Sequence, residues 1–286
     1  MKKRNLIPLI PLFFSLFSCQ ETKNENVIFT SFYPIYDFTK RIVGDHFDVV
    51  NLTPPGVEPH DFELSTKQVA SFYDGKALFL NGIGMEYWSD SLPKDLKGKT
   101  YTVTDKIEIR KEDGIDDPHV WLTPLNAITE MKNILSIVNT LDPTHKEDYE
   151  KNYQKAEQEF LSLHEEIKEK RKTFTQNKLV VAHAAFGYFC QEYELEQIAV
   201  HGLEPEEEPT AKEIENILDL VKEYNINTIF TEEMASQEIA EKISQETGCK
   251  LEVLSPIENL EEEEVGKEDY LSLMRENLEK IEEACK

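Results

Sequence analysis

The architecture of this chain is set by residues 143–174, which read PTHKEDYEKNYQKAEQEFLSLHEEIKEKRKTF. The segment has no glycine, no proline after its first residue, and many Glu, Lys and Gln side chains. Its apolar residues recur every three or four positions, which predicts one amphipathic helix of about 30 residues and about 45 Å. These residues are Tyr149, Tyr153, Ala156, Phe160, Leu163 and Ile167. Such a helix would be a stiff connector between two parts of the protein.

Apolar, strand-like segments alternate with helical patterns on both sides of this helix. Candidate strands lie at 27–31, 48–52, 77–81 and 101–104 in the first half, and at 179–182, 228–231 and 251–254 in the second. Such alternation predicts α/β units with mostly parallel sheets flanked by helices. We therefore expect two similar lobes, at 27–142 and 176–286, joined by a linking helix at 143–175. The acidic segment 105–117 has no periodic pattern and is interpreted as a surface loop.

The composition excludes one large class of function. The chain has 286 residues, of which 56 are acidic and 31 basic, giving a formal net charge of -25. Nucleic-acid-binding modules that neutralise phosphates need the opposite charge, so no nucleic-acid partner is expected. The 40% of hydrophobic residues is enough for a substantial core.

The N-terminus carries the features of an export signal. Three basic residues, Lys2-Lys3-Arg4, precede an apolar run that is too short to span a bilayer. This pattern is typical of a secretory signal peptide, here residues 1–18. The following Leu16-Phe17-Ser18-Cys19 resembles the bacterial lipobox, in which the cysteine receives a lipid. We expect lipidation at Cys19, a tether at 19–26, and an exported protein anchored to a bacterial membrane, at the cell surface or in the periplasm.

Export permits disulfides, since these persist outside the cytoplasm. The remaining cysteines are Cys190, Cys249 and Cys285. A bridge from Cys249, which precedes a strand-like segment, to Cys285, which ends the last helix, would fix the C-terminus to its lobe. We expect this disulfide; the alternative is three buried, inert thiols.

Three histidines share a position relative to the expected strands and helices. His60 follows a strand and a Pro-Pro-Gly turn, His119 precedes a helix, and His183 directly follows the strand at 179–182. Ligands of open α/β sheets bind beyond the carboxyl ends of the strands, so these side chains can meet between the lobes. Histidines joined by a carboxylate suit zinc. A single loop histidine is more often a surface residue, however, and the short signatures of zinc proteases, zinc ribbons and serine hydrolases are absent from the sequence.

Six motifs in a fixed order resemble those of a known family. They are Val57-Glu58-Pro59-His60-Asp61-Phe62-Glu63, Asn81-Gly82-Ile83-Gly84-Met85-Glu86, Asp117-Pro118-His119-Val120-Trp121-Leu122, His183-Ala184-Ala185-Phe186-Gly187-Tyr188, Pro205-Glu206-Glu207-Glu208-Pro209 and Ser255-Pro256-Ile257-Glu258. With the lipobox in front, the chain resembles the zinc/manganese solute-binding proteins of bacterial ABC uptake transporters, most closely their zinc-binding lipoprotein branch. The resemblance runs from about residue 27 to the C-terminus.

The resemblance implies a metal ion held between two α/β lobes. It carries three ligands onto His60, His119 and His183, and a fourth onto Glu258. Manganese-binding relatives have an aspartate where this chain has Ser255 and often a carboxylate at His183, so Zn²⁺ is expected and Mn²⁺ is the less favoured cargo. A water molecule in place of Glu258 is an alternative. Glu58 is a competing carboxylate whose expected role is to support a ligand.

The same resemblance implies the function. Zn²⁺ would be captured outside the cytoplasm and delivered to a membrane permease of an ABC transporter by a monomeric, non-enzymatic protein. Trp121 and Phe186 are expected to wall the site. Capture should weaken below about pH 6, where histidine protonates. The alternatives are manganese uptake, a surface adhesin that also binds metal, and a zinc-dependent hydrolase, which would need an open coordination position.

Overall fold

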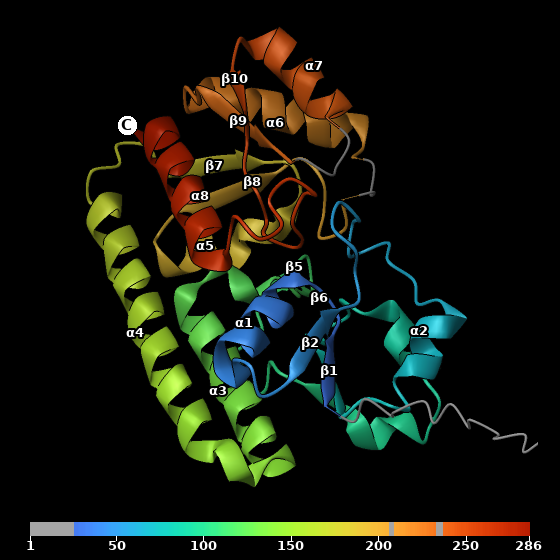
Figure 1. Cartoon of the computed structure of the whole chain (residues 1–286). Coiled ribbons are helices and arrows are strands. Elements are labelled where there is room, and N and C mark those ends of the chain that lie inside the picture. The colour runs from blue at the N-terminus through green and yellow to red at the C-terminus, as the bar shows by residue number, and fades with distance from the viewer. Residues whose placement is uncertain (1–25, 206–208, 233–236) are drawn as a thin grey trace, which may run out of the picture.

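A computed structural model describes residues 26–205, 209–232 and 237–286 (Figure 1). The expected signal peptide, Cys19 and all of the tether except Asn26 lie outside these residues, as do the glutamates at 206–208. Within the described ranges, every helix is too short or too polar to cross a membrane.

The first lobe is built on a four-stranded parallel sheet in the order β2-β1-β3-β4. Its strands are β1 (Val27–Thr30), β2 (Asp48–Asn51), β3 (Ala77–Leu80) and β4 (Thr100–Thr102). The helices of this lobe are α1 (Tyr33–Val43), α2 (Thr66–Ser71) and α3 (Pro124–Leu141), with short 3-10 helices η1 (Tyr87–Ser91), η2 (Leu96–Lys99) and η3 (Val120–Leu122). Ser65 caps the N-terminus of α2 in a capping box with Gln68. The two side chains accept hydrogen bonds from each other's backbone N–H groups, which would otherwise be unpaired at the start of the helix.

The second lobe repeats this plan with the order β10-β9-β7-β8, again all parallel. The strands are β7 (Lys178–Val181), β8 (Glu196–Ala199), β9 (Thr228–Thr231) and β10 (Lys250–Val253). The helices are α5 (Gly187–Glu192), α6 (Ala211–Glu223), α7 (Glu238–Thr247) and α8 (Tyr270–Cys285), with the 3-10 helix η5 (Ala184–Phe186). The predicted α/β architecture of two mostly parallel sheets flanked by helices is confirmed.

The long helix α4 (Lys146–Arg171) follows a 3-10 turn, η4 (Pro143–His145). All six of its predicted apolar positions are buried. It packs against α1 and α3 of the first lobe and α8 of the second, along one side of the molecule (Figure 1). Aromatic rings join the two lobes there: the Phe160 ring lies 5.8 Å from Phe38 and 5.2 Å from Tyr270. The main apolar core is therefore continuous between the lobes.

The segment 105–117 contains a structure that its sequence did not predict. β5 (Lys111–Glu112) and β6 (Ile115–Asp116) form a small antiparallel hairpin. Its two-residue turn is Asp113-Gly114, and both residues have positive φ, of 49° and 87°. This is the geometry that an Asp-Gly turn favours between antiparallel strands. The hairpin leads the chain directly to His119.

The expected disulfide between Cys249 and Cys285 is not formed. Cys190, Cys249 and Cys285 are all free and buried. Cys249 lies in the apolar cluster beneath α6 and α7, where its thiol donates to the carbonyl of Ile226 at 3.0 Å. Cys285 lies in the main core instead. Because the two thiols are embedded in different apolar clusters, they are not positioned to form a bond.

Candidate metal centre

Three histidines reach one point from three different loops. His60 lies between β2 and α2, where its backbone N–H donates to Glu58 Oε1 at 3.2 Å. His119 precedes η3, and His183 lies between β7 and η5. All three side chains are buried, with 6% of His60 and none of His119 or His183 exposed. The loops at the carboxyl ends of the strands thus place two candidate ligands of the first lobe against one of the second.

Glu258 comes from the loop after β10, which is firmly anchored. The backbone of Ser255 donates to and accepts from the side-chain amide of Asn277 on α8. The Trp121 indole N–H donates to the carbonyl of Pro256 at 2.9 Å. Ile257 has a positive φ of 55°, a conformation that turns the chain sharply just before Glu258. The Glu258 carboxylate is 1% exposed and points at the histidines.

Five of the six distances between the donor atoms are close to those that a small tetrahedral cation requires, and all four atoms lie within 4.8 Å of one another. The Nε2 atom of His119 lies 3.2 Å from that of His60 and 3.1 Å from that of His183. Glu258 Oε1 lies 3.6, 3.3 and 3.5 Å from the Nε2 atoms of His60, His119 and His183, respectively. Metal–ligand bonds of about 2.0–2.1 Å at tetrahedral angles would separate the donors by about 3.3–3.4 Å. The four side chains could therefore hold one ion with little movement.

A carboxylate lies beside the other ring nitrogen of each histidine. Nδ1 of His119 is 2.8 Å from Asp117 Oδ1, and Nδ1 of His183 is 2.7 Å from Glu232 Oε1. Nδ1 of His60 is 3.0 Å from Glu204 Oε2. At His119 and His183 this hydrogen bond keeps the proton on Nδ1 and leaves the lone pair of Nε2 directed at the point that the donors share. The contact of His60 with Glu204 is within ion-pair distance but lacks hydrogen-bond geometry.

Asp117 is supported in turn by a cation. Arg110 Nη1 donates to Asp117 Oδ2 at 2.6 Å. Burial raises the pKa of Asp117, but His119 and Arg110 lower it by more than burial raises it. The pKa of Asp117 therefore lies below its ordinary value. The Asp117 side chain is fully buried and stays ionised because both of its oxygens are paired.

The charges within the donor set stabilise one another. Burial raises the pKa of Glu258, but the neighbouring histidines lower it more, so the pKa lies well below its ordinary value. Burial lowers the pKa of His60, yet Glu258 and Glu204 raise it, to about 10. Burial also lowers the pKa of His183, whereas Glu232 and Glu258 hold it well above the usual range. A site that gathers this much negative charge around imidazoles attracts a proton or a metal cation.

The other sequence candidates lie around the donor set. Burial and the nearby Glu258 raise the pKa of Glu58 to about 8, and its carboxylate accepts from the His60 backbone. The Trp121 ring is fully buried, with its centroid 5.3 Å from that of His119. Phe186 is buried in the main core, where its ring centroid is 6.5 Å from that of Phe189.

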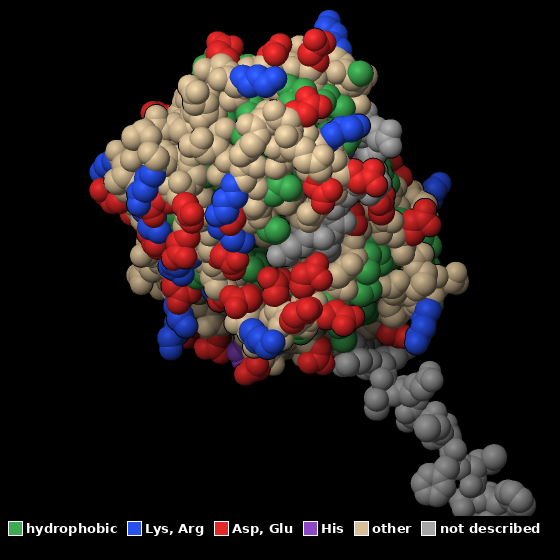
Figure 2. Space-filling model, turned by 90° about the horizontal axis from the view of Figure 1, so that it is seen from above, with side chains coloured by type: hydrophobic (Ala, Val, Ile, Leu, Met, Phe, Trp, Pro, Cys, Tyr) green, Lys and Arg blue, Asp and Glu red, His purple; other side chains and the backbone are tan. Residues whose placement is uncertain are grey.

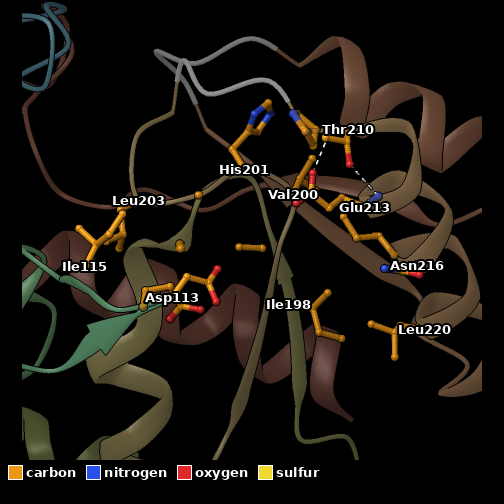
Figure 3. Close-up of a pocket in the computed structure, with 16 residues that line it drawn as sticks. Asp113, Ile115, Ile198, Val200, His201, Leu203, Thr210, Glu213, Asn216 and Leu220 are labelled. Carbon is orange, nitrogen blue, oxygen red and sulfur yellow. Dashed lines mark hydrogen bonds between the residues drawn. The ribbon is translucent and has the colours of Figure 1, made fainter.

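A separate cavity of about 500 Å³ lies on the second lobe, between the β5–β6 hairpin and α6. Figure 3 shows apolar side chains such as Ile198, Leu203 and Leu220 lining it, with Asp113 and Glu213 among the polar ones. His201 lines this cavity. None of the four donor residues does, so the cavity is distinct from the candidate metal centre.

Sequence reasoning missed the residues that orient the ligands. Asp117 stands two residues before His119, and Glu232 directly follows β9, so their positions offered a local signal. Glu204 offered none, because it contacts a residue far away in the sequence, and Arg110, seven residues before Asp117, lies in a segment without a periodic pattern. These groups become visible only when the lobes are assembled.

The comparisons with known proteins agree with this geometry. The sequence model of a family described as zinc-uptake complex component A, periplasmic (ZnuA), matches residues 28–284. The high-affinity zinc uptake system protein ZnuA of Bacillus subtilis is 35% identical over 276 residues, which cover 90% of this chain and 86% of that protein. The chain spans 61% of the length of the streptococcal zinc-binding AdcA proteins that it also matches.

Two solved structures are similar over nearly the whole chain. The laminin-binding protein Lmb of Streptococcus agalactiae, described as bifunctional with adhesin and metal transporting activity, superposes with a TM-score of 0.85 at 33% identity, over 91% of this chain and 99% of its own. The Zn(II)-bound ZnuA-like domain of Streptococcus pneumoniae AdcA gives 0.81 at 36% identity, with the same coverage. The family match over residues 28–284, the two-lobed fold and the buried donor set agree, and the chain belongs to the ZnuA family of zinc-uptake components.

Proposed function

We propose that this protein captures Zn²⁺ outside the cytoplasm with His60, His119, His183 and Glu258, and delivers it to the membrane permease of an ABC-type importer. The observation that carries the proposal is that five of the six donor-to-donor distances lie between 3.1 and 3.6 Å. These distances match the edges of a tetrahedron around an ion of zinc's size. Related proteins are named for zinc uptake and zinc binding.

The donor chemistry favours zinc over manganese. Three imidazole nitrogens and one carboxylate form a four-coordinate set that suits zinc, whereas manganese prefers sites richer in oxygen with more ligands. Glu258 also argues against catalysis. A zinc hydrolase leaves one coordination position for an activated water, and in the proposed site the Glu258 carboxylate would fill that position.

We further propose that the protein acts as a lipid-anchored monomer. Cys19 follows the signal-like segment, and a relative from Streptococcus pneumoniae is named a zinc-binding lipoprotein. Acidic side chains gather on the face seen from above the molecule (Figure 2). A negative surface raises the local concentration of cations, which fits a protein that collects Zn²⁺.

The test is the metal content of the purified full chain, determined by elemental mass spectrometry. We expect one zinc per chain and no zinc in His183→Ala. Addition of Mn²⁺ at the same concentration as the zinc should not displace the zinc from the protein. Manganese in the purified protein, or no metal after exposure to zinc, would overturn the proposal. The matched control is His145→Ala, because this histidine is partly exposed on η4, outside the donor set, and its loss should leave the zinc in place.

A second candidate function is adhesion, favoured by the similarity to the laminin-binding protein of Streptococcus agalactiae. Adhesion and metal capture would use separate surfaces, because the metal donors are buried. His60→Ala should then abolish tight zinc binding and leave binding to laminin-coated plates unchanged. Failure of the parent protein to bind laminin would remove this candidate.

A further inference from the structure

The three carboxylates that face the histidine Nδ1 atoms differ in origin. Asp117 belongs to the same lobe as its partner His119, and Glu232 belongs to the same lobe as its partner His183. Glu204 differs, because it lies in the second lobe, in the loop after β8, while its partner His60 lies in the first. Among these three described contacts, the one at Glu204 alone joins one lobe to a metal-ligand candidate of the other.

Glu204 also differs in exposure. The side chains of Asp117 and Glu232 are 0% and 4% exposed, whereas that of Glu204 is 39% exposed. A buried carboxylate is fixed by its surroundings. A half-exposed one can move into water without leaving a charge buried and unpaired.

The second oxygen of Glu204 binds another group of the first lobe. The hydroxyl of Tyr87, on η1, donates to Glu204 Oε1 at 2.5 Å, while Oε2 faces His60. Tyr87 is 63% exposed, so apolar packing contributes little to holding it in place. One carboxylate of the second lobe thus accepts a hydrogen bond from Tyr87 of the first lobe and lies within ion-pair distance of His60.

This contact lies at the accessible side of the candidate metal centre. A cavity of about 480 Å³ opens between the 60–64 loop and η1, and both His60 and Tyr87 line it. His60 is the most exposed of the four donor residues, at 6%, against 1% for Glu258 and none for the other two histidines. Asp61 and Glu63 also line the cavity and bring negative charge to it. A cation that approaches through this cavity meets His60 first.

We propose that Glu204 and Tyr87 form an interlobe clasp that orients His60 and controls the rate at which the ion enters and leaves the site. This inference rests on the proposed function, because it assigns kinetic control to the same metal centre. Glu204 is a positioning residue in this scheme and does not itself ligate the ion. For the ion to leave past His60, the Tyr87–Glu204 hydrogen bond must break and the Glu204 carboxylate must move away.

The clasp predicts that rates change more than affinity. A hydrogen bond to a charged group that must break before exchange adds to the barrier for both entrance and release. Removing the Tyr87 hydroxyl should therefore speed both steps by about tenfold, equivalent to about 1.4 kcal/mol of barrier. Because both rates rise together, the dissociation constant should change by less than about threefold.

The experiment measures zinc release from the loaded full chain into excess EDTA by stopped flow, together with the equilibrium affinity. Tyr87→Phe removes only the hydroxyl, and Glu204→Gln removes the charge. Tyr73→Phe is the matched control, because the Tyr73 hydroxyl is likewise exposed and donates to a carboxylate, that of Asp95, at 3.1 Å within the first lobe. We expect about tenfold faster release in Tyr87→Phe and in Glu204→Gln, and the parental rate in Tyr73→Phe.

The outcomes separate the clasp from the proposed function. Full zinc stoichiometry with the parental release rate in both Tyr87→Phe and Glu204→Gln would overturn the clasp and leave the proposed function standing. A parent that binds no zinc would overturn both. A loss of affinity in Tyr87→Phe as large as its gain in release rate would also overturn the clasp, since it would show that this hydrogen bond stabilises the bound state without controlling exchange.

Discussion

Arg110 lies against Gly187 so closely that a methyl group added to this glycine would sit 1.8 Å from the guanidinium Nη1. The two residues belong to different lobes, and Gly187 begins α5, four residues after His183. The same guanidinium binds Asp117, which faces Nδ1 of His119. The absence of a side chain at Gly187 in the second lobe therefore leaves room for Arg110 to support His119, through Asp117, in the first lobe.

Gly187→Ala should weaken zinc binding by about tenfold, within the 10- to 100-fold range seen when groups that orient metal ligands are lost. The added methyl group would displace the guanidinium from Asp117. Arg110→Met should weaken zinc binding to a similar extent. The double variant should bind zinc no more weakly than the weaker-binding single variant, because both changes break the same contact, that between Arg110 and Asp117. Competition with a chromogenic zinc chelator measures the affinities.

The control for this prediction is Gly98→Ala, because a methyl group at Gly98 would meet no atom within 4 Å. Its zinc affinity should equal that of the parent. Additive losses in the Gly187→Ala, Arg110→Met double variant would show that the two residues act on the site independently.

Zinc binding should release protons near neutral pH. The pKa of His60 is raised to about 10, and that of His183 lies well above its usual range. At about pH 7 the metal-free site therefore holds protons that the ion must displace. A raised histidine pKa makes the affinity fall as the pH decreases from about 10, so the loss starts well above the pH of about 6 expected from an ordinary histidine.

Calorimetry in two buffers of different protonation enthalpy counts these protons. Each released proton is taken up by the buffer and adds that buffer's protonation enthalpy to the observed binding enthalpy. The observed enthalpies should therefore differ between the two buffers by at least the difference between their protonation enthalpies. Identical enthalpies in the two buffers at about pH 7 would contradict the raised pKa values.

Glu130 should make the fold less stable as the pH rises. It is fully buried on α3, and neither carboxyl oxygen has a hydrogen-bond partner among the described residues. Burial, with Glu86 nearby, raises its pKa well above the ordinary value. Above a pH of about 4.3 the unfolded chain loses a proton that the folded protein keeps, so stability falls by up to about 1.4 kcal/mol per pH unit until the folded-state pKa is reached.

Glu130→Gln removes this titration while keeping the shape of the side chain. The variant should raise the melting temperature more at about pH 8 than at about pH 5, as followed by differential scanning fluorimetry of the metal-free protein. An equal shift at both pH values would mean that Glu130 is not held protonated in the fold.

The free cysteines predict insensitivity to reductant. Because Cys190, Cys249 and Cys285 are unpaired, the melting temperature should be the same with and without a reducing agent. Thiol titration of the denatured, unreduced protein should detect all three. A thiol count that is lower by two without reductant than with it would reveal a disulfide.

Much of the fold could be predicted because its signals are local. The apolar spacing of α4 and the apolar strands depend on residues close together in the sequence, and His183 comes two residues after the end of β7. β8 was missed, since Glu196 and Gln197 give this edge strand little apolar pattern. The hairpin at 111–116 was missed because its strands are only two residues each.

The environment of the metal centre could be predicted only in part. The resemblance supplied the four donors, but the contacts of Glu204 and Arg110 depend on how the lobes meet. The Cys249–Cys285 pairing was wrong because the positions of the two cysteines in the sequence do not show that their thiols lie in different apolar clusters.

The coordination of bound zinc tests the central claim most directly. X-ray absorption at the zinc edge of the loaded full chain should show four nitrogen or oxygen donors at about 2.0–2.1 Å, three of them imidazoles. Glu258→Ala should change this shell by replacing or losing one oxygen donor. A six-coordinate shell, fewer than three imidazoles, or an unchanged spectrum in Glu258→Ala would contradict a site made of His60, His119, His183 and Glu258.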